Sequence, residues 1–294
     1  MLSAEEQSLC QTRPNVIDYD RVEQLHYLGN YTRRLPVSLA RMMENAYDWE
    51  HLPYVHASSF SAIELVDSGK WGWRAKTGLP EAAGGGTQLL DLLIDLDRHY
   101  WATTVFAGMG EGVQIHTQAT GVTENEIDID VRFYLPEKPD DEVAAIVLSY
   151  MQDQYATLYD EDADLMAGRQ AALDDAKRWR AQGGTTDNIA VGRLDDLGPG
   201  KTHIVETPTG RYCVRHWQDQ WIAHSAVCPH LLGPLDDSAI DDQGHITCPW
   251  HGYSFDVTGG TNVGTGDHEG AASCRALTMA ETVARDGVLY LKLD

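Results

Sequence analysis

The sequence predicts an α+β chain of two domains: an antiparallel sheet followed by one long helix, and then a small domain rich in β structure. Three patterns support this prediction. Apolar and polar residues alternate in a series of segments before residue 136, as expected for strands with one solvated face. Residues 139–182 have helical spacing. Beyond residue 190, frequent Gly, Pro and Asp separate short strand-like segments.

The strand pattern is clearest in EIDIDVRFYL, at residues 126–135, where acidic residues and one arginine alternate with Ile, Val and Phe. The segments SAIELVDS, KWGWRAK, QLLDLLIDLD, HYWATTVFAG and VQIHTQA alternate in the same way. The helical stretch contains a single glycine, Gly168, and GGTTDN at 183–188 is typical of a C-cap and linker. We therefore expect a first domain at 1–182, a linker at 183–190 and a second domain at 191–294.

The composition argues against some classes of partner. The chain has 294 residues, with 22 Lys and Arg against 45 Asp and Glu and a formal charge of −23, which disfavours binding to a phosphate backbone. No apolar run is long enough to span a bilayer. The acidic start MLSAEEQSLCQ lacks the basic and apolar regions of a secretory signal. We expect a cytoplasmic protein without nucleic-acid or membrane partners.

Four metal-binding side chains occupy two short boxes of the second domain. Cys228-x-His230 is followed, after 17 residues, by Cys248-x-x-His251. Two Cys and two His also suit tetrahedral zinc, but each box here pairs one Cys with one His and leads into a glycine-bearing turn. The boxes resemble the cluster-binding loops of Rieske proteins, in which cysteines hold one iron of a [2Fe-2S] cluster and histidines hold the other. The resemblance implies that Cys228, His230, Cys248 and His251 bind such a cluster, with structural zinc as the alternative.

Positions beside the boxes indicate the branch of Rieske proteins. Respiratory and photosynthetic members carry an extra disulfide-forming Cys in each box, where this chain has Gly233 and Trp250. Tyr253 and Phe255 stand where those members have hydroxyl donors to the cluster sulfurs. Fewer donors stabilise the reduced cluster less, so the resemblance implies a low potential, as in the ferredoxin and oxygenase branch. Three further cysteines have no partner at ligand spacing and are expected to be buried apolar residues: Cys10, Cys213 and Cys274.

A second metal-binding pattern lies in the segment ENAYDWEHLPYVH. The spacing predicts a helix that carries Asn45, Asp48 and His51 on one face. Pro53 is expected to end this helix, so that His56 can turn back towards His51. The pattern Asn45-x-x-Asp48-x-x-His51-x-x-x-x-His56 is similar to the iron-binding motif of Rieske non-haem iron oxygenases.

This second resemblance implies a catalytic domain in which two histidines and a carboxylate hold Fe2+ and leave positions open for dioxygen. His51 and His56 would be the histidine ligands. The family's carboxylate comes from a long helix at the end of the domain, and YDEDADLMAGRQ favours Asp162, with Asp164 as the runner-up. In the family, the position of Asp48 bridges a cluster histidine and an iron-binding histidine, which implies an electron-transfer route through this residue.

The family's catalytic domain has a helix-grip (START-like) fold, a curved antiparallel sheet against a long C-terminal helix, and the resemblance implies the same fold here. Oxygenase α subunits carry the Rieske domain first, whereas this chain carries it last. The reversed order leaves open both the family's homotrimeric assembly and whether electrons pass within or between subunits.

The implied activity is the use of O2 to hydroxylate, demethylate or dihydroxylate a small organic substrate, with aromatic compounds among the candidates. Electrons would come from a separate NAD(P)H-dependent reductase, with or without a ferredoxin. Four aromatic strand residues either contact a substrate or pack in the core: Trp73, Trp101, Phe106 and Phe133. The alternative function is an electron carrier or redox sensor whose N-terminal domain binds a ligand without oxygen chemistry.

Overall fold

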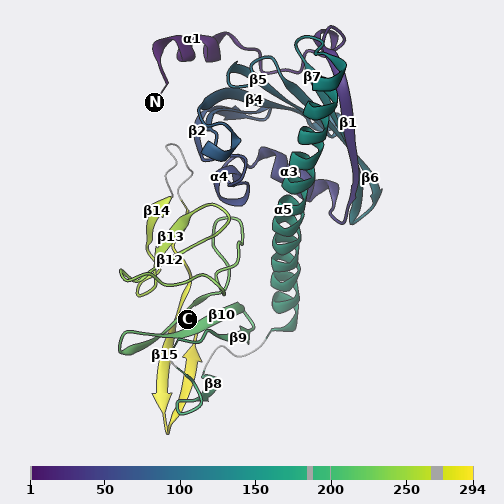
Figure 1. The fold of residues 1–294 in the computed structure, drawn as a ribbon. Helices are drawn as coiled ribbons and strands as arrows, with labels where there is room; N and C mark the ends of the chain where they lie inside the picture. The colour runs from purple at the N-terminus through teal and green to yellow at the C-terminus, as the bar shows by residue number, and fades with distance from the viewer. Residues whose placement is uncertain (1, 184–187, 199, 266–273, 294) are drawn as a thin grey trace. The chain divides into compact units, whose positions relative to one another are not determined.

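The computed structural model describes residues 2–183, 188–198, 200–265 and 274–293 (Figure 1). Residues 184–187 of the expected linker lie outside the described residues. The chain forms two compact units, the first ending at Ala167 and the second beginning at Gly168, so the boundary lies inside the longest helix, α5 (Asp141–Gln182). None of the described helices is long and apolar enough to cross a membrane.

The first unit is built on an antiparallel sheet, which has seven strands in the described residues, in the order β1-β7-β6-β5-β4-β3-β2. Its strands are β1 (His26–Leu35), β2 (Ala62–Gly69), β3 (Gly72–Gly78), β4 (Thr87–Asp95), β5 (Tyr100–Gly108), β6 (Gln114–Thr123) and β7 (Glu126–Leu135). Its helices are α1 (Ala4–Thr12), α2 (Tyr19–Val22), α3 (Leu39–Tyr47), α4 (Leu52–Val55), the first part of α5, and the 3-10 turns η1 (Glu81–Ala83) and η2 (Leu96–Arg98). The six predicted strands correspond to β2–β7. The sequence analysis missed β1, where polar residues and Gly29 interrupt the alternation.

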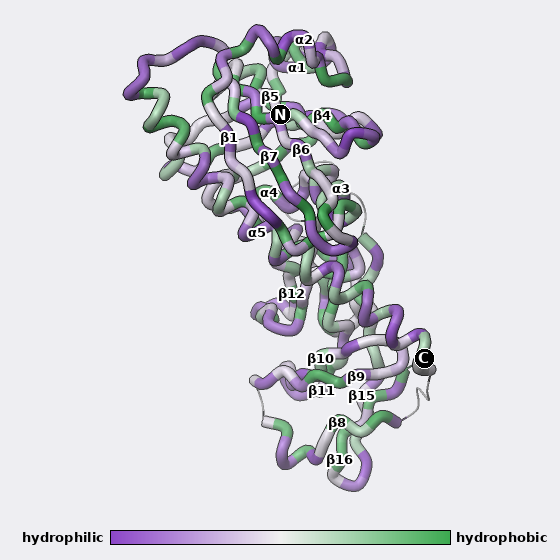
Figure 2. Tube along the Cα trace, turned by 90° about the vertical axis from the view of Figure 1, so that its right-hand side faces the viewer, coloured by the Kyte–Doolittle hydropathy of each residue, from purple (hydrophilic) through white to green (hydrophobic). Residues whose placement is uncertain are grey.

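Alternation along β7 separates the two faces of the sheet (Figure 2). Its apolar residues are at most 1% exposed and form the core: Ile127, Ile129, Val131 and Phe133. The charged residues between them point to the opposite face, where Asp128 pairs with Arg34 of the neighbouring β1 and Asp130 pairs with Arg132. A shift of one residue in register would reverse both faces, so this pattern specifies how β7 pairs.

Helix α5 covers the apolar face of this sheet. The Tyr155 ring meets Phe133 edge-on at 5.3 Å between centroids, and Tyr159 stacks on Tyr31 of β1 at 6.4 Å. Arg33 of β1 adds a 2.5 Å ion pair to Asp160. These contacts anchor the helix turn that carries the acidic segment 160–164.

The segment between β1 and β2 contains two short helices instead of the one helix that the sequence predicts. α3 ends at Tyr47, and Asp48 follows it with an extended backbone at φ −84° and ψ 92°. His51 is the N-cap of α4, and Pro53 lies in the first turn of that helix, where its missing N–H costs no hydrogen bond. The prediction that Pro53 ends a helix running through His51 was therefore wrong: the chain breaks at Asp48, and the proline begins the next helix.

The second unit holds the end of α5 and two small antiparallel sheets. In the described residues, one sheet has the order β8-β16-β15-β11-β10-β9 and the other has the order β12-β13-β14. Their strands are β8 (Ile189–Arg193), β9 (His203–Thr207), β10 (Gly210–Trp217), β11 (Gln220–Ser225), β12 (His245–Thr247), β13 (Tyr253–Asp256), β14 (Asn262–Thr265), β15 (Met279–Arg285) and β16 (Val288–Lys292). The predicted antiparallel sheet, the long helix and the β-rich C-terminal domain are thus confirmed.

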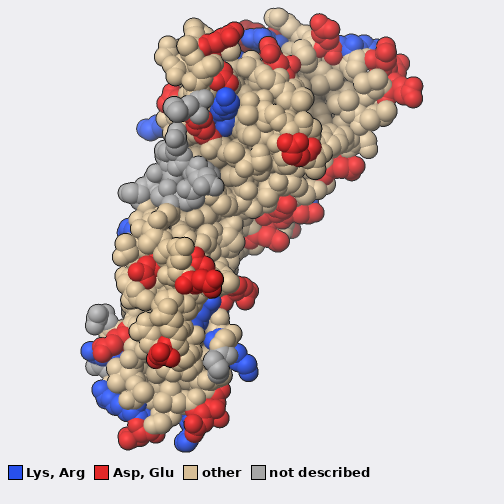
Figure 3. Space-filling model, turned by 60° about the vertical axis from the view of Figure 1, so that its left-hand side comes forward, with Lys and Arg blue, Asp and Glu red and all other residues tan. Residues whose placement is uncertain are grey.

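Acidic side chains are scattered over the face of the molecule that Figure 3 shows. This distribution agrees with the formal charge of −23. Repulsion between such surfaces favours solubility and disfavours polyanionic partners.

Candidate metal centres

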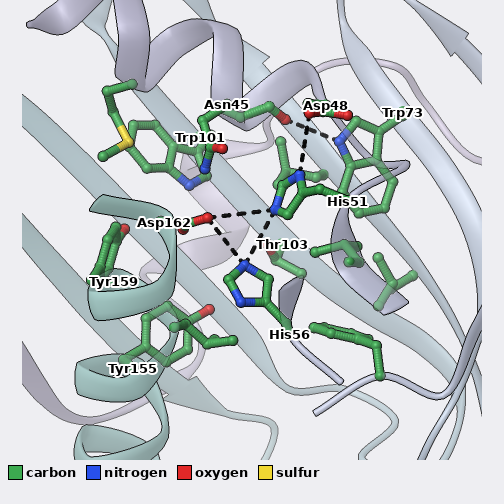
Figure 4. Close-up of a pocket in the computed structure, with 17 residues that line it drawn as sticks. Asn45, Asp48, His51, His56, Trp73, Trp101, Thr103, Tyr155, Tyr159 and Asp162 are labelled. Atoms are coloured by element: carbon green, nitrogen blue, oxygen red, sulfur yellow. Dashed lines mark hydrogen bonds and ion pairs between the residues drawn. The ribbon is translucent and has the colours of Figure 1, made fainter. Parts of the chain in front are cut away.

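Two histidines and one carboxylate converge in the first unit (Figure 4). His51 and His56 stand at the two ends of α4, as its N-cap and C-cap, and Asp162 reaches them from α5. All three side chains are buried, with 3%, 2% and 8% of their surfaces exposed. One turn of helix between the histidines lets both rings face the same point.

The donor atoms of these residues are spaced as metal ligands are. The Nε2 atoms of His51 and His56 lie 3.2 Å apart, and Asp162 Oδ1 lies 3.1 Å from His56 Nε2 and 3.5 Å from His51 Nε2. With metal–ligand bonds of about 2.1 Å, two ligands are separated by about 3.0 Å at a right angle and about 3.4 Å at a tetrahedral angle. The donor set therefore fits one metal ion held on one face by two imidazoles and a carboxylate.

The charges of these groups are strongly coupled. Burial disfavours the imidazolium form of His51, but the nearby carboxylates of Asp162 and Asp48 outweigh burial and raise its pKa to about 10. Burial likewise opposes ionisation of Asp162, but hydrogen bonds from His51 and His56 lower its pKa well below the usual range. A divalent cation would take the place of the shared proton, so metal binding at this centre releases a proton.

Each histidine also faces a second carboxylate with its other ring nitrogen. His51 Nδ1 lies 3.5 Å from Asp48 Oδ2, and His56 Nδ1 lies 2.7 Å from Glu161 Oε2. The sequence analysis singled out Asp48 but gave Glu161 no role. The sequence feature that could have indicated a role for Glu161 was its position next to Asp162 on the same predicted helix. Asp164, the runner-up ligand, is exposed and is not part of the converging group.

A cavity of about 120 Å³ adjoins the three donors. Its walls are mostly apolar and aromatic: Met42, Phe60, Trp73, Leu90, Leu92, Trp101, Tyr155, Leu158 and Tyr159 line it together with Asn45 and Thr103. Two of the four aromatic strand residues considered from the sequence, Trp73 and Trp101, thus border the site. Phe133 is fully buried in the core, and Phe106 packs beneath Arg13 at 4.3 Å from its ring centroid.

The two Cys-His boxes of the second unit adopt the same turn. Cys228 O accepts from Leu232 N at 3.0 Å while Cys228 N donates to Gly233 O at 2.8 Å. In the second box, Cys248 O accepts from Gly252 N at 3.0 Å while Cys248 N donates to Tyr253 O at 2.8 Å. The same pair of backbone hydrogen bonds thus holds the loop of each cysteine.

The four predicted cluster ligands are brought together by these turns. The rings of His230 and His251 lie 4.6 Å apart between centroids and are perpendicular. A hydrogen bond from Cys228 lowers the pKa of Cys248 to about 5, with a further contribution from His251, while the same contact raises the pKa of Cys228. Two cysteine sulfurs beside two imidazoles are a donor set that fits a Rieske cluster.

The positions that replace the disulfide of other Rieske proteins are neighbours in the structure. A Cβ atom on Gly233 would lie 3.0 Å from the Trp250 ring and 2.7 Å from Cys248 Sγ. Trp250 also packs on Gly168 of α5, where a Cβ atom would lie 3.0 Å from the indole. This contact explains a glycine in the interior of a helix, where it costs about 1 kcal/mol relative to Ala.

The remaining cysteines differ in exposure. Cys10 and Cys213 are buried at 5% and 0% exposure, as expected for small apolar residues. Cys274 is only partly buried, and its hydrogen bond contributes to the raised pKa of Cys228.

Comparisons with known proteins identify the second unit. Residues 187–272 match the family model of the Rieske [2Fe-2S] domain. Pheophorbide a oxygenase of Arabidopsis thaliana is 39% identical over 72 residues, 22% of this chain and 12% of the relative. Flavonoid 8-hydroxylase 2 of Ocimum basilicum is 38% identical over 42 residues, 14% of this chain and 8% of the relative. The chain therefore spans only about a tenth of the length of these relatives.

Two solved structures from Nocardioides aromaticivorans match part of this chain. The ferredoxin of carbazole 1,9a-dioxygenase from Nocardioides aromaticivorans matches 37% of this chain and 99% of its own, at 22% identity and a TM-score of 0.31. The terminal oxygenase of the same system matches 42% of this chain and 35% of its own, at 16% identity and a TM-score of 0.35. The family match places a Rieske [2Fe-2S] domain in the C-terminal part of this chain, and 72 residues of the chain are similar to part of a relative that is named an oxygenase.

Proposed function

We propose that the chain is a Rieske-type oxygenase that binds Fe2+ at His51, His56 and Asp162 and oxidises a small organic substrate with O2. The main evidence for this proposal is the buried triad, whose donor atoms lie within 4.8 Å of one another beside an apolar cavity. A protein that only carries electrons has no use for such a centre. When bound, the iron would supply open positions for dioxygen, and the cluster would supply single electrons from outside.

The chain's own residues prepare this site in three ways. Asp162 stays ionised despite its burial because two imidazoles contact it. His51 and His56 present Nε2 atoms to the same point. The apolar walls exclude bulk water, which protects reactive species from side reactions. We propose that the sheet and α5 form the helix-grip fold of the family's catalytic domain.

The cavity supports a planar, largely apolar substrate group. A cavity of about 150 Å³ lined by apolar side chains is known to accept a benzene ring, so the 120 Å³ beside the triad suits one ring or a short alkyl group. The names of two relatives, pheophorbide a oxygenase and flavonoid 8-hydroxylase, specify ring-containing substrates. Hydroxylation, demethylation and dihydroxylation share this metal chemistry and differ in how the substrate is placed. Electrons would come from a separate NAD(P)H-dependent reductase, directly or through a ferredoxin. The reversed domain order leaves the oligomeric state open, with the family's homotrimer as one candidate.

The first experiment measures iron and acid-labile sulfide on anaerobically purified protein, with the His51→Ala/His56→Ala double variant as its pair. The proposal expects about three irons and two sulfides per chain in the parent, and about two and two in the variant. Two irons and two sulfides in both proteins, even after reconstitution with Fe2+, would support the electron carrier or redox sensor instead.

If the third iron is present, oxidation of aromatic compounds is then measured with a reductase, a ferredoxin and NADH. Parent protein that consumes O2 in step with hydroxylated or demethylated product supports the oxygenase, and the double variant serves as the matched control. Parent protein that holds the third iron but passes electrons without product formation would contradict it.

A further inference from the structure

Glu161 makes a short contact with one of the two histidines of the triad. Its Oε2 atom lies 2.7 Å from His56 Nδ1, whereas Asp48 Oδ2 lies 3.5 Å from His51 Nδ1. The first distance is that of a charge-assisted hydrogen bond, while the second is longer than a well-formed one. The two histidines are therefore held unequally, and His56 is held by Glu161.

The helix explains how neighbouring residues reach opposite sides of one ring. Successive residues of α5 point about 100° apart around the helix axis. Asp162 approaches Nε2 of His56 at 3.1 Å, and Glu161, whose side chain is one methylene longer, reaches around to Nδ1. A single turn of α5 thus contacts both nitrogens of the same imidazole.

The contact determines which nitrogen of His56 carries the proton. A carboxylate only accepts hydrogen bonds, so Nδ1 must be the donor to Glu161. In the neutral ring, Nε2 then has the free lone pair, and this atom faces His51 Nε2 and Asp162 Oδ1. A partner of this kind fixes the tautomer and orientation of a ligand histidine and makes the ring a better ligand.

Neighbouring acidic residues do not share this position. Asp160 pairs with Arg33 at 2.5 Å and is 68% exposed in its side chain, and Asp164 is exposed. The side chain of Glu161 is 31% exposed. Its placement against a buried imidazole is therefore specific to this residue of the acidic segment.

We propose that Glu161 is the positioning residue of the metal centre: it holds His56 with Nε2 towards the metal and thereby sets how tightly the centre retains Fe2+. This inference rests on the proposed function for the identity of the metal. Loss of such a partner lowers metal affinity by about 10- to 100-fold in comparable centres. We expect the affinity of the triad for Fe2+ to decrease by that factor when the charge of Glu161 is removed. The content of the [2Fe-2S] cluster should not change.

The test compares Glu161→Gln and Glu161→Ala with the matched control Asp160→Asn on the full chain with its cluster retained. The triad is first emptied with a ferrous chelator, and Fe2+ is then titrated back anaerobically. Co2+ is titrated in parallel, because its visible absorption reports ligand geometry. Glutamine keeps an oxygen acceptor for Nδ1–H but loses the charge, so Glu161→Gln should weaken binding and Glu161→Ala should weaken it further.

Acid-labile sulfide and the melting temperature are measured on every variant. If Glu161 had a purely structural role, its substitution would change these two quantities and leave the dissociation constant for Fe2+ unchanged. The inference is supported if both Glu161 variants bind Fe2+ at least 10-fold more weakly while Asp160→Asn binds like the parent. It is overturned if Glu161→Gln and Glu161→Ala bind within twofold of the parent, or if Asp160→Asn weakens binding equally. If the parent itself takes up neither Fe2+ nor Co2+, the proposed function fails, and the inference fails with it.

Discussion

At the scale of single residues, close contacts around the two metal centres decide which side chains the positions accept. His51 and His56 each have one ring nitrogen towards the shared point of the triad and the other towards a carboxylate. In the second unit, Gly233 lies so close to Cys248 Sγ and Trp250 that no side-chain atom fits between them. The glycine is required there by space and not by backbone conformation, because its φ is not among the positive values.

Gly233→Ala is expected to prevent normal cluster binding. The new Cβ would lie 2.7 Å from Cys248 Sγ and 3.0 Å from the Trp250 ring, so the ligand thiol or the indole must move. The measurements are acid-labile sulfide per chain and the visible absorbance of the cluster. Both should fall to less than half of the parent's values. Gly259→Ala is the matched control, because its Cβ would meet its nearest atom at an ordinary 3.9 Å. Equal sulfide content in Gly233→Ala and the parent would show that the loop can relax.

At the scale of elements, the sheet of the first unit separates two different environments. The face towards α5 lines the cavity beside the triad, while the opposite face of β5 and β6 carries a buried histidine, His116. Its Nδ1 accepts from the Tyr100 hydroxyl at 2.8 Å, and its Nε2 donates to Gln114 Oε1 at 2.9 Å. Burial, with a smaller contribution from Arg132, lowers the pKa of His116 to about 4.

His116 is expected to make the fold sensitive to acid. Well above pH 6.5 the residue is neutral in both states and adds no pH dependence. Below pH 6.5 the unfolded chain binds a proton that the folded chain rejects until about pH 4, so the free energy of unfolding falls through this window. The loss is about 2 kcal/mol at pH 5 and about 3 kcal/mol at pH 4.

Urea unfolding of the parent and of His116→Gln at pH 7 and pH 5 measures this contribution. The variant should lose about 2 kcal/mol less stability than the parent between the two pH values, because it has no imidazole to protonate. Other acid-sensitive groups, including the buried His224 with its pKa of about 4, are common to both proteins and cancel in the difference. Parallel stability changes in the two proteins would contradict the assignment.

At the scale of the whole molecule, the two candidate centres draw on different parts of the chain. The triad comes from residues 51–162, and the cluster boxes come from residues 228–251. The side chain of Asp48 is 8% exposed and lies beside His51 in the first unit, at 3.5 Å from Nδ1. The proposal that it also contacts His230 or His251, within one subunit or between two, remains a prediction.

Asp48→Asn is expected to separate metal binding from coupled turnover. Asparagine keeps the shape of the side chain but loses the charge that orients imidazoles. We expect the variant to retain about three irons and two sulfides per chain while substrate oxidation falls at least 100-fold. Iron and sulfide analysis, reduction of the cluster by dithionite and product formation are measured on the same preparation. Wild-type rates of product formation would exclude a bridging role, and loss of the third iron would point to a structural role instead.

Much of the fold and of both candidate centres was accessible from the sequence, because it depends on local patterns. Period-2 alternation predicted β2–β7, and a long stretch with one glycine and no internal proline predicted α5 to its C-terminal residue. The cluster boxes and the His51–His56 spacing were recognisable since metal ligands sit at short, regular intervals. The helix break at Asp48 could not be predicted from the sequence, because a proline such as Pro53 is compatible both with the end of one helix and with the first turn of another.

By itself, the sequence determined the kinds of ligand, the strand faces, the long helix and the acidic surface. Only the tertiary structure decided which carboxylate of the acidic segment meets the histidines, that Glu161 holds the far side of His56, and why Gly168 interrupts a helix. Strand alternation, helix spacing and charge are properties of neighbours along the chain. The choice of Asp162 over Asp164 depends instead on how α5 is rotated against the sheet, and that rotation is set by packing between residues more than a hundred positions apart, such as Tyr31 and Tyr159.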